Sequence, residues 1–253
     1  LYMNDQSRIF DFLYHQLNNF SKEMMFAGKI GDEWKGYSTQ EVADTVNKLS
    51  AGFLKMGLGG HDMQVENQDK IAIVSKNRPE WLMLDLACQQ VGIPLCPIYP
   101  TTNPKELSFI LNDATIKYIF ISGEDILEKV VSIKNEVPSL KGIYSYDNIA
   151  GVTFWDEIIK NITPEDLQKV EAVKATIKAE HCATIIYTSG TTGKPKGVML
   201  SHRNLVSNVL NSVTSFPFEK NVEGRSLSFL PLNHIFERMV SYIYIYNGIS
   251  IYY

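Results

Sequence analysis

Cysteine is scarce in this sequence, and none of its cysteines is paired. Cys88, Cys96 and Cys182 are the three cysteines among 253 residues, each lies in an apolar stretch, and none belongs to a Cys-x-x-Cys motif. The sequence therefore lacks the spacing of a disulfide framework or of a cysteine-ligated zinc site. We expect three buried free thiols in a reducing compartment, which disfavours a catalytic cysteine.

A long apolar run and an excess of positive charge are also missing. The most apolar stretch, residues 239–253, is shorter than the roughly 20 residues of a membrane-spanning helix and is interrupted by Asn247 and Gly248. Residues 1–20 mix polar and apolar side chains, unlike a signal peptide. The net charge is -4, and the scattered lysines predict no nucleic-acid partner. We expect a cytoplasmic protein, and peripheral membrane contact through its substrate stays open.

An initiator methionine is missing as well. The chain begins at Leu1, and residues 248–253 have the pattern of a buried strand with nothing after it. We expect the chain to be an N-terminal fragment of a longer protein. Its composition, 45% hydrophobic and 21% charged, is that of an ordinary globular protein, and its length suffices for one large domain or two lobes.

What the sequence does have is an alternation of strand and helix patterns. Ser7 is predicted to cap a first helix, and Ser38 with Glu41 forms a capping box for a second one, after a hairpin at residues 24–37. Strand patterns at residues 70–74, 94–99, 118–121, 142–145 and 183–187 then alternate with helix patterns at 79–91, 104–114 and 124–135. This alternation predicts the α/β class, with helices on both faces of a parallel sheet.

The last of these strands leads into a segment rich in glycine and hydroxyl side chains, residues 187–197 with the sequence YTSGTTGKPKG. Glycine lets a backbone approach a ligand closely, hydroxyls and backbone N–H groups donate to phosphate oxygens, and Lys194 and Lys196 add positive charge. A flexible linker is not expected directly between two apolar runs. A Walker P-loop needs glycine where Thr188 stands and Ser or Thr where Pro195 stands. The segment therefore predicts a polyphosphate-binding loop of another kind.

Residues 184–202 resemble the signature of the adenylate-forming superfamily, which contains acyl-CoA synthetases, luciferases and peptide-synthetase adenylation domains. The resemblance implies that this loop binds the β- and γ-phosphates of ATP while a carboxylate attacks the α-phosphate. The implied phosphate-binding residues are Thr188, Ser189, Gly190, Thr191, Thr192, Gly193, Lys194 and Lys196. Thr188 is also the implied contact for Mg2+.

A second motif lies at residues 230–238, with the sequence LPLNHIFER. A lone histidine after a strand is more often a helix cap or a satisfied core group than a functional one. Here its pattern, His234 followed by Phe236, Glu237 and Arg238, resembles the long-chain fatty acyl-CoA synthetase branch. The resemblance implies that His234 is the catalytic residue that orients the carboxylate or adenylate, and that His234, Phe236 and Glu237 line the acyl site. Glu237 and Arg238 fit a structural ion pair equally well, and residues 242–246 alternate like a strand where the family has a helix.

The resemblance also implies a fold and its division. The chain would be the N-terminal part of the two-lobed αβαβα large domain of adenylate-forming enzymes, with an incomplete second lobe and no C-terminal domain. Residues 1–66 would belong to the second lobe, residues 67–216 would form the first lobe with the phosphate loop at 184–202, and residues 217–253 would begin the second lobe. An exposed strand edge of an incomplete lobe would favour self-association.

The implied function is a long-chain fatty acid–CoA ligase. Its substrates would be ATP and a fatty acid, with Mg2+ and with coenzyme A as co-substrate, and the reaction would pass through an acyl-adenylate. The chain lacks the family's later Tyr-Gly-x-Thr-Glu segment, ribose-binding aspartate and C-terminal lysine, so we expect it to be inactive, or nearly so, by itself. Two alternatives stay open: an adenylating enzyme for a short-chain, aryl or amino acid, and a non-catalytic nucleotide-binding module.

Overall fold

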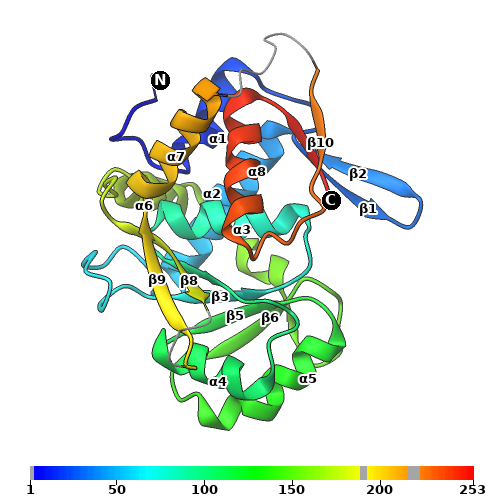
Figure 1. The fold of residues 1–253 in the computed structure, drawn as a ribbon, viewed down its shortest axis with the longest axis vertical. Helices are drawn as coiled ribbons and strands as arrows, with labels where there is room; N and C mark the ends of the chain where they lie inside the picture. The colour runs from blue at the N-terminus through cyan, green and yellow to red at the C-terminus, as the bar shows by residue number, and fades with distance from the viewer. Residues whose placement is uncertain (1–2, 189–192, 216–222) are drawn as a thin grey trace.

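The computed structural model of the protein describes residues 3–188, 193–215 and 223–253, and it contains two β-sheets with helices around and between them (Figure 1). The helices are α1 (Asp11–Asn19), α2 (Thr39–Lys55), α3 (Pro79–Gln90), α4 (Pro104–Asp113), α5 (Glu124–Ile133), α6 (Pro164–Lys174), α7 (His202–Ser215) and α8 (Ile235–Asn247), with short 3₁₀ segments at Lys134–Glu136 and Trp155–Ile159. The strands are β1 (Phe26–Ile30), β2 (Glu33–Tyr37), β3 (Ile71–Val74), β4 (Leu95–Pro97), β5 (Tyr118–Ile121), β6 (Gly142–Ser145), β7 (Thr153–Phe154), β8 (Cys182–Thr188), β9 (Lys196–Ser201), β10 (Arg225–Leu227) and β11 (Ser250–Tyr252). The predicted α/β class is confirmed.

The larger sheet has the strand order β7-β6-β5-β3-β4-β8-β9. Its strands run parallel except β9, which returns antiparallel to β8. All four residues of β3 are buried, as expected for a strand covered by helices on both faces. The chain moves from β3 to β4 on one side and later to β5 on the other side. The carboxyl ends of β3 and β5 therefore border the crevice in which sheets of this type bind ligands.

The smaller sheet joins the beginning and the end of the described chain. Its order is β10-β11-β1-β2, with β1 parallel to β11 and antiparallel to β2. Phe26 pairs with Ile251 in this sheet, and both side chains are fully buried. The predicted hairpin thus shares a sheet with strands that follow the phosphate loop in the sequence. Helix α2, however, packs on α3 and α6 beside the larger sheet, so the division into residues 1–66, 67–216 and 217–253 stays a prediction.

Helix α3 is the structural centre of the protein. It contacts β1 of the smaller sheet and β4 of the larger sheet, and α2 packs along it (Figure 1). Every residue of α3 except Glu80 is buried. A helix that is buried all round needs no polar face, which explains why this segment is apolar along most of its length. Its one buried carboxylate, Asp85, has a partner that is described below.

Local signals in the sequence predicted some helix boundaries correctly and others wrongly. The capping box of Ser38 and Glu41 is confirmed at the start of α2, where both reciprocal hydrogen bonds are present. The prediction that Ser7 caps the first helix is wrong, because α1 begins at Asp11 and the Ser7 hydroxyl accepts a hydrogen bond from the backbone N–H of Asn4. Residues 242–246, which alternate like a strand, lie inside helix α8, because Tyr242 and Ile245 pack inward one turn apart.

The three cysteines are buried and free, as predicted. Burial raises the pKa of Cys96 to about 12 and that of Cys182 to about 11, so both thiols stay protonated at neutral pH. A protonated thiol is a poor nucleophile, which agrees with a structural role. Within the described residues, no helix is both long and apolar enough to cross a membrane.

Candidate active site

The predicted phosphate loop connects the two strands of a hairpin at the edge of the larger sheet. Strand β8 leads into it and β9 leaves it, and Thr188 pairs with Lys196 across the hairpin. Gly193 has a φ of 81°, a left-handed conformation that favours glycine. Gly197 serves the packing instead, because a Cβ there would lie 3.1 Å from the ring of Tyr187, its cross-strand partner. One glycine of the motif therefore has a structural role.

The described loop residues are open to solvent and carry uncompensated positive charge. Thr188, Gly193, Lys194 and Lys196 are all exposed. Neither lysine makes an ion pair with any residue in the described part of the chain. The remaining predicted phosphate contacts, Ser189, Gly190, Thr191 and Thr192, lie outside the described residues. The hairpin thus presents two free lysines at the carboxyl end of β8, where an anionic ligand would neutralise them.

His234 is the N-cap residue of helix α8, as one of the two sequence interpretations predicted. Its Nδ1 accepts a hydrogen bond of 3.2 Å from the backbone N–H of Phe236, and the side chain is exposed. Because Nδ1 accepts, the neutral ring carries its proton on Nε2. The cap therefore fixes the tautomer and leaves Nε2 as a hydrogen-bond donor for a ligand.

The segment before α8 is fastened to the carboxyl edge of the larger sheet by two asparagines. The Asn233 side chain donates to the carbonyl of Ile98, just after β4, at 2.6 Å. The Asn77 side chain, just after β3, donates to the carbonyl of Leu230 at 2.6 Å and accepts from the N–H of Leu232 at 2.9 Å. These contacts bring the start of α8 to the same edge of the sheet from which β8 leads into the phosphate loop. The sequence analysis missed Asn77. Its position between strand β3 and the start of α3 at Pro79 is the sequence feature that could have indicated a functional side chain at the carboxyl edge of the sheet.

Glu237 and Arg238 do not form an ion pair with each other. The Glu237 carboxylate, 5% exposed, accepts a hydrogen bond of 2.6 Å from the Ser228 hydroxyl, and burial raises its pKa. Arg238 is fully buried and pairs with Asp85 of helix α3. The predicted ion pair between Glu237 and Arg238 is therefore wrong: Glu237 bonds Ser228, and Arg238 pairs with Asp85. A charged residue in the otherwise apolar helix α3 was the signal that a buried cation had to face it.

Apolar side chains surround the start of α8 on the surface. Phe236 is 59% exposed, and Phe229 and Leu230 on the preceding segment are 76% and 38% exposed. Large apolar side chains are seldom exposed together unless something covers them. Phe236 and the cap residue His234 belong to the same helix start, and their place beside an acyl group stays a prediction. Glu237, the third predicted acyl-site residue, points into the protein, where its side chain bonds Ser228.

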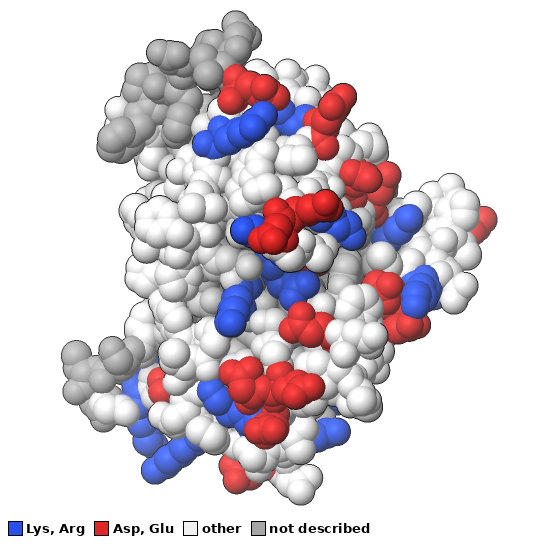
Figure 2. Space-filling view, turned by 90° about the vertical axis from the view of Figure 1, so that its right-hand side faces the viewer, with Lys and Arg blue, Asp and Glu red and all other residues white. Residues whose placement is uncertain are grey.

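A cavity of about 520 Å³ opens at the carboxyl ends of β3, β5 and β6, against the β1–β2 hairpin. Three lysines from separate elements line it: Lys29, Lys35 and Lys76. None of the three forms an ion pair with a residue in the described ranges, whereas Arg78 in the same wall is neutralised by Glu80 and Asp147. On the part of the surface that is described in Figure 2, acidic and basic side chains are interspersed without a broad basic patch. The cavity lining also contains the carboxylates of Glu80, Asp125 and Asp147, so four basic and three acidic side chains face it.

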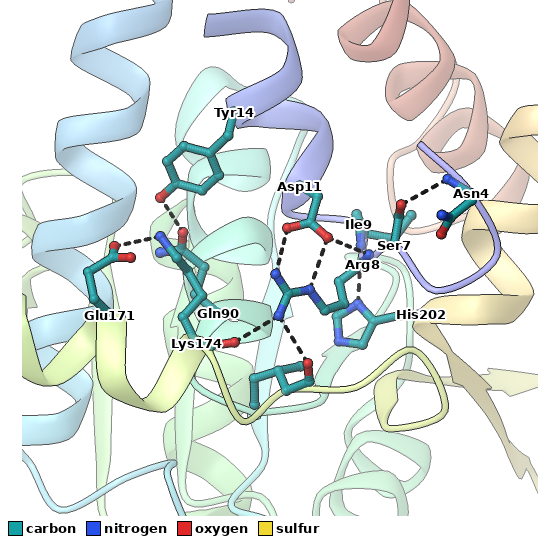
Figure 3. Close-up of polar contacts among 11 residues, drawn as sticks. Asn4, Ser7, Arg8, Ile9, Asp11, Tyr14, Gln90, Glu171, Lys174 and His202 are labelled. Atoms are coloured by element: carbon teal, nitrogen blue, oxygen red, sulfur yellow. Dashed lines mark hydrogen bonds and ion pairs between the residues drawn. The ribbon is translucent and has the colours of Figure 1, made fainter. Parts of the chain in front are cut away.

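The base of the hairpin is held by the N-terminal segment. His202 follows β9 directly, and its Nδ1 accepts from the N–H of Ile9 at 3.3 Å (Figure 3). Its ring also meets the ring of Phe10 edge-on. Arg8 lies beside this contact, pairs with Asp11 and donates to the carbonyls of Lys174 and Ile177 at the end of α6. The N-terminal segment therefore connects the phosphate-loop hairpin to α6.

The burial of His202 predicts an acid-sensitive stability. Burial, and then the positive charge of Arg8, lowers the pKa of His202 from 6.5 to about 3. Between pH 6.5 and pH 3 the His202 side chain is protonated in the unfolded chain and neutral in the folded chain. His202 therefore contributes stability above pH 6.5 that is lost progressively as the pH falls toward 3. Between about pH 7.5 and pH 5 we expect a loss on the order of 2 kcal/mol in the free energy of unfolding.

Urea unfolding of the chain and of the His202→Gln variant at both pH values measures this effect. The variant keeps a hydrogen-bond acceptor but cannot bind the proton, so its free energy of unfolding should change less between the two pH values. Equal changes in the variant and in the original chain would contradict the assignment to His202.

Comparison with known proteins identifies the family and the fold. The chain belongs to the AMP-binding enzyme family, whose model matches residues 13–253. Long-chain acyl-CoA synthetases are among its relatives: it is 32% identical over 238 residues to long chain acyl-CoA synthetase 6, peroxisomal, of Arabidopsis thaliana, which covers 88% of this chain and 31% of that protein. It is 32% identical over 235 residues to fatty acyl-CoA synthetase A of Dictyostelium discoideum, with 90% of this chain and 33% of that protein covered. The chain thus spans about a third of the length of these curated relatives.

Solved structures agree on the fold. A long-chain-fatty-acid-CoA ligase (FadD1) from Archaeoglobus fulgidus superposes with a TM-score of 0.80 at 19% identity, over 100% of this chain and 47% of that chain. The N-terminal domain of FACL13 from Mycobacterium tuberculosis superposes with a TM-score of 0.74 at 18% identity, over 97% of this chain and 56% of that chain. The predicted fold, the N-terminal part of the large domain of adenylate-forming enzymes, is confirmed.

Proposed function

We propose that this chain is the ATP- and acid-binding part of a long-chain fatty acid–CoA ligase that works through an acyl-adenylate. The observation that carries the proposal is the placement of two sites at one edge of the larger sheet. The loop hairpin with its free lysines leaves that edge at β8, and Asn77 and Asn233 fasten the His234 segment to the same edge. An enzyme that joins a carboxylate to the α-phosphate of ATP needs two such sites side by side.

In this mechanism the chain's own residues mainly position and neutralise. The loop, with Lys194 and Lys196, holds the β- and γ-phosphates so that pyrophosphate is the leaving group. Nε2 of His234 donates to an oxygen of the carboxylate or of the adenylate, and Phe236 packs on the acyl chain. The hydroxyl of Thr188 would offer a bound Mg2+ one hard oxygen ligand, and the ion would supply charge neutralisation on the phosphates. Among the described residues, no group of three or more His, Cys, Asp or Glu side chains is placed to hold a metal ion.

The cavity at β3 and β5 suits the second anionic substrate. Coenzyme A carries phosphates, and the cavity at the ligand-binding edge of the sheet offers three lysines that form no ion pair with any described residue, beside the carboxylate of Asp125. The ATP phosphates are assigned to the loop hairpin, at the other side of the sheet beyond β4. We therefore assign the lysine-lined cavity to coenzyme A.

Two pairs of lysine substitutions test these assignments against each other. Replacing Lys194 and Lys196 by Met should weaken binding of ATP to the chain about 10-fold or more and leave binding of coenzyme A unchanged, because each phosphate contact is charge-assisted. Replacing Lys35 and Lys76 by Met should do the opposite. Calorimetric titration of both variants with both ligands gives the answer. Equal losses for both ligands in either variant would contradict the separate assignment.

Pyrophosphate release tests the function itself. A longer protein that contains this chain and the later family segments should release pyrophosphate with long-chain fatty acids and ATP, and the 253-residue chain alone should not. A panel of short-chain, aryl and amino acids covers the alternative adenylating enzymes. If no acid in the panel supports release although ATP binds, the non-catalytic nucleotide-binding module becomes the better proposal.

The cellular setting of the protein rests on the sequence alone. Cytoplasmic location, peripheral membrane contact through the fatty acid, and self-association of the chain stay predictions. They are secondary to the proposed chemistry, which does not depend on them.

A further inference from the structure

Arg238 is a buried cation one helical turn after His234. Its side chain is 0% exposed, so it cannot touch a substrate in solution. Its guanidinium makes a two-pronged contact with the Asp85 carboxylate of α3, in which Nε lies 3.1 Å from Oδ2. Nε also donates to the Tyr242 hydroxyl at 2.8 Å. Arg238 therefore fastens helix α8, which His234 opens, to the central helix α3.

The remaining arm of the guanidinium reaches the strand that leads into the phosphate loop. Nη1 of Arg238 donates to the Thr184 hydroxyl at 2.6 Å, and that hydroxyl donates in turn to the carbonyl of Leu95 in β4 at 2.6 Å. Thr184 lies on β8, four residues before Thr188. One side chain thus connects the helix of His234, the central helix and the strand of the loop.

A packing role alone does not require this arrangement. Apolar side chains of similar volume fill a protein interior at least as favourably as a buried ion pair. A guanidinium, in contrast, is planar and rigid, and its donors point in fixed directions, so it fixes the relative position of the groups that accept from it. Lysine cannot replace it, because a single ammonium does not span Asp85 and Thr184 in the same way.

We propose that Arg238 is a positioning residue for adenylate formation, which holds α8 against β8 so that His234 and the phosphate loop keep a fixed separation. The inference rests on the proposed function, because the separation matters only if the carboxylate and ATP react between the two sites. Neither the Phe236-Glu237-Arg238 motif nor the loop signature alone indicates the link, since its partners Asp85 and Thr184 lie far from Arg238 in the sequence.

Substitutions at Thr184 offer a matched pair for the test. Thr184→Val keeps the shape and removes the hydroxyl, whereas Thr184→Ser keeps the hydroxyl. In the longer, active protein, Thr184→Val and Arg238→Lys should each lower kcat for pyrophosphate release by about 100-fold, the effect of a misplacement near 1 Å, with KM for ATP within about 3-fold of the original. Thr184→Ser should stay within about 3-fold in kcat. The double variant Arg238→Lys/Thr184→Val should be no slower than the slower single variant, because both changes cut the same link.

Hydrogen exchange in the 253-residue chain gives a reading that needs no activity. Exchange of the amides at residues 239–242, the first in α8 with acceptors inside the helix, should be faster in Thr184→Val than in Thr184→Ser by about 10-fold, after correction for the measured difference in global stability. A protein without pyrophosphate release before any substitution would defeat the proposed function. Normal kcat in Thr184→Val, equal losses in Thr184→Ser, multiplied losses in the double variant, or equal exchange in the two Thr184 variants would each overturn the positioning role.

Discussion

Replacing Arg238 by Met should lower the free energy of unfolding by about 3–5 kcal/mol, the cost of leaving a buried charge without its partner. The Asp85 carboxylate would stay in the centre of the protein, where its own side chain is 0% exposed, and would keep only its hydrogen bonds from Gln89 and the Tyr242 hydroxyl. A loss of that size is a large part of the 5–15 kcal/mol that is typical of a folded domain. Urea unfolding followed by circular dichroism measures it.

The double variant Arg238→Met/Asp85→Leu is the control for this prediction. It removes both charges and fills much of the same volume with apolar atoms, so it should recover most of the lost stability. The expectation fails if the single variant loses less than about 1 kcal/mol or if the double variant is as unstable as the single one. The control also separates stability from positioning, because a stable double variant would still lack the link to Thr184.

Replacing His234 by Ala should lower kcat for pyrophosphate release by about 100-fold, within the range seen when one preorganised hydrogen-bond donor is removed from an active site. The reason is the fixed tautomer: Nδ1 accepts from the N–H of Phe236, so Nε2 is left as the proposed donor to the substrate. The same change also removes the N-cap of α8, which should cost about 1 kcal/mol of stability. The measurement uses a longer protein that contains this chain and releases pyrophosphate, and it includes both KM values.

Serine at position 234 separates the two roles of the histidine. His234→Ser keeps a good N-cap and loses the imidazole, so it should be close to the original in thermal stability and close to His234→Ala in kcat. Thermal unfolding of the 253-residue chain and kinetics of the longer protein compare the three versions. Near-normal kcat in His234→Ser would show that His234 only caps the helix, which was the other interpretation of its position in the sequence.

Local sequence signals were reliable where a short segment decides its own structure. The capping box at Ser38 needs only two residues three positions apart. The strands of a buried parallel sheet are recognisable because each is a short run of apolar side chains. The same locality explains the errors. Ser7 is a residue type that often caps helices. However, Arg8 bonds the carbonyl of Lys174 and the N–H of Ile9 bonds His202, so the helix starts later, at Asp11. Residues 242–246 alternate, but α8 buries Tyr242 and Ile245 by helical spacing.

The sequence by itself determined the α/β class and the histidine that opens α8, because each follows from neighbouring residues. The phosphate loop was likewise predicted from a run of neighbouring residues, and its role stays a prediction. Only the tertiary structure decided which partners the charges take. Arg238 pairs with Asp85 rather than with Glu237, and Asn77 fastens the segment before His234, because the folded chain brings together residues about 150 positions apart. The lysine-lined cavity arises in the same way. Lys76 follows β3 of the larger sheet, Lys29 and Lys35 belong to the β1–β2 hairpin of the smaller sheet, and the fold brings the hairpin against the carboxyl ends of β3 and β5.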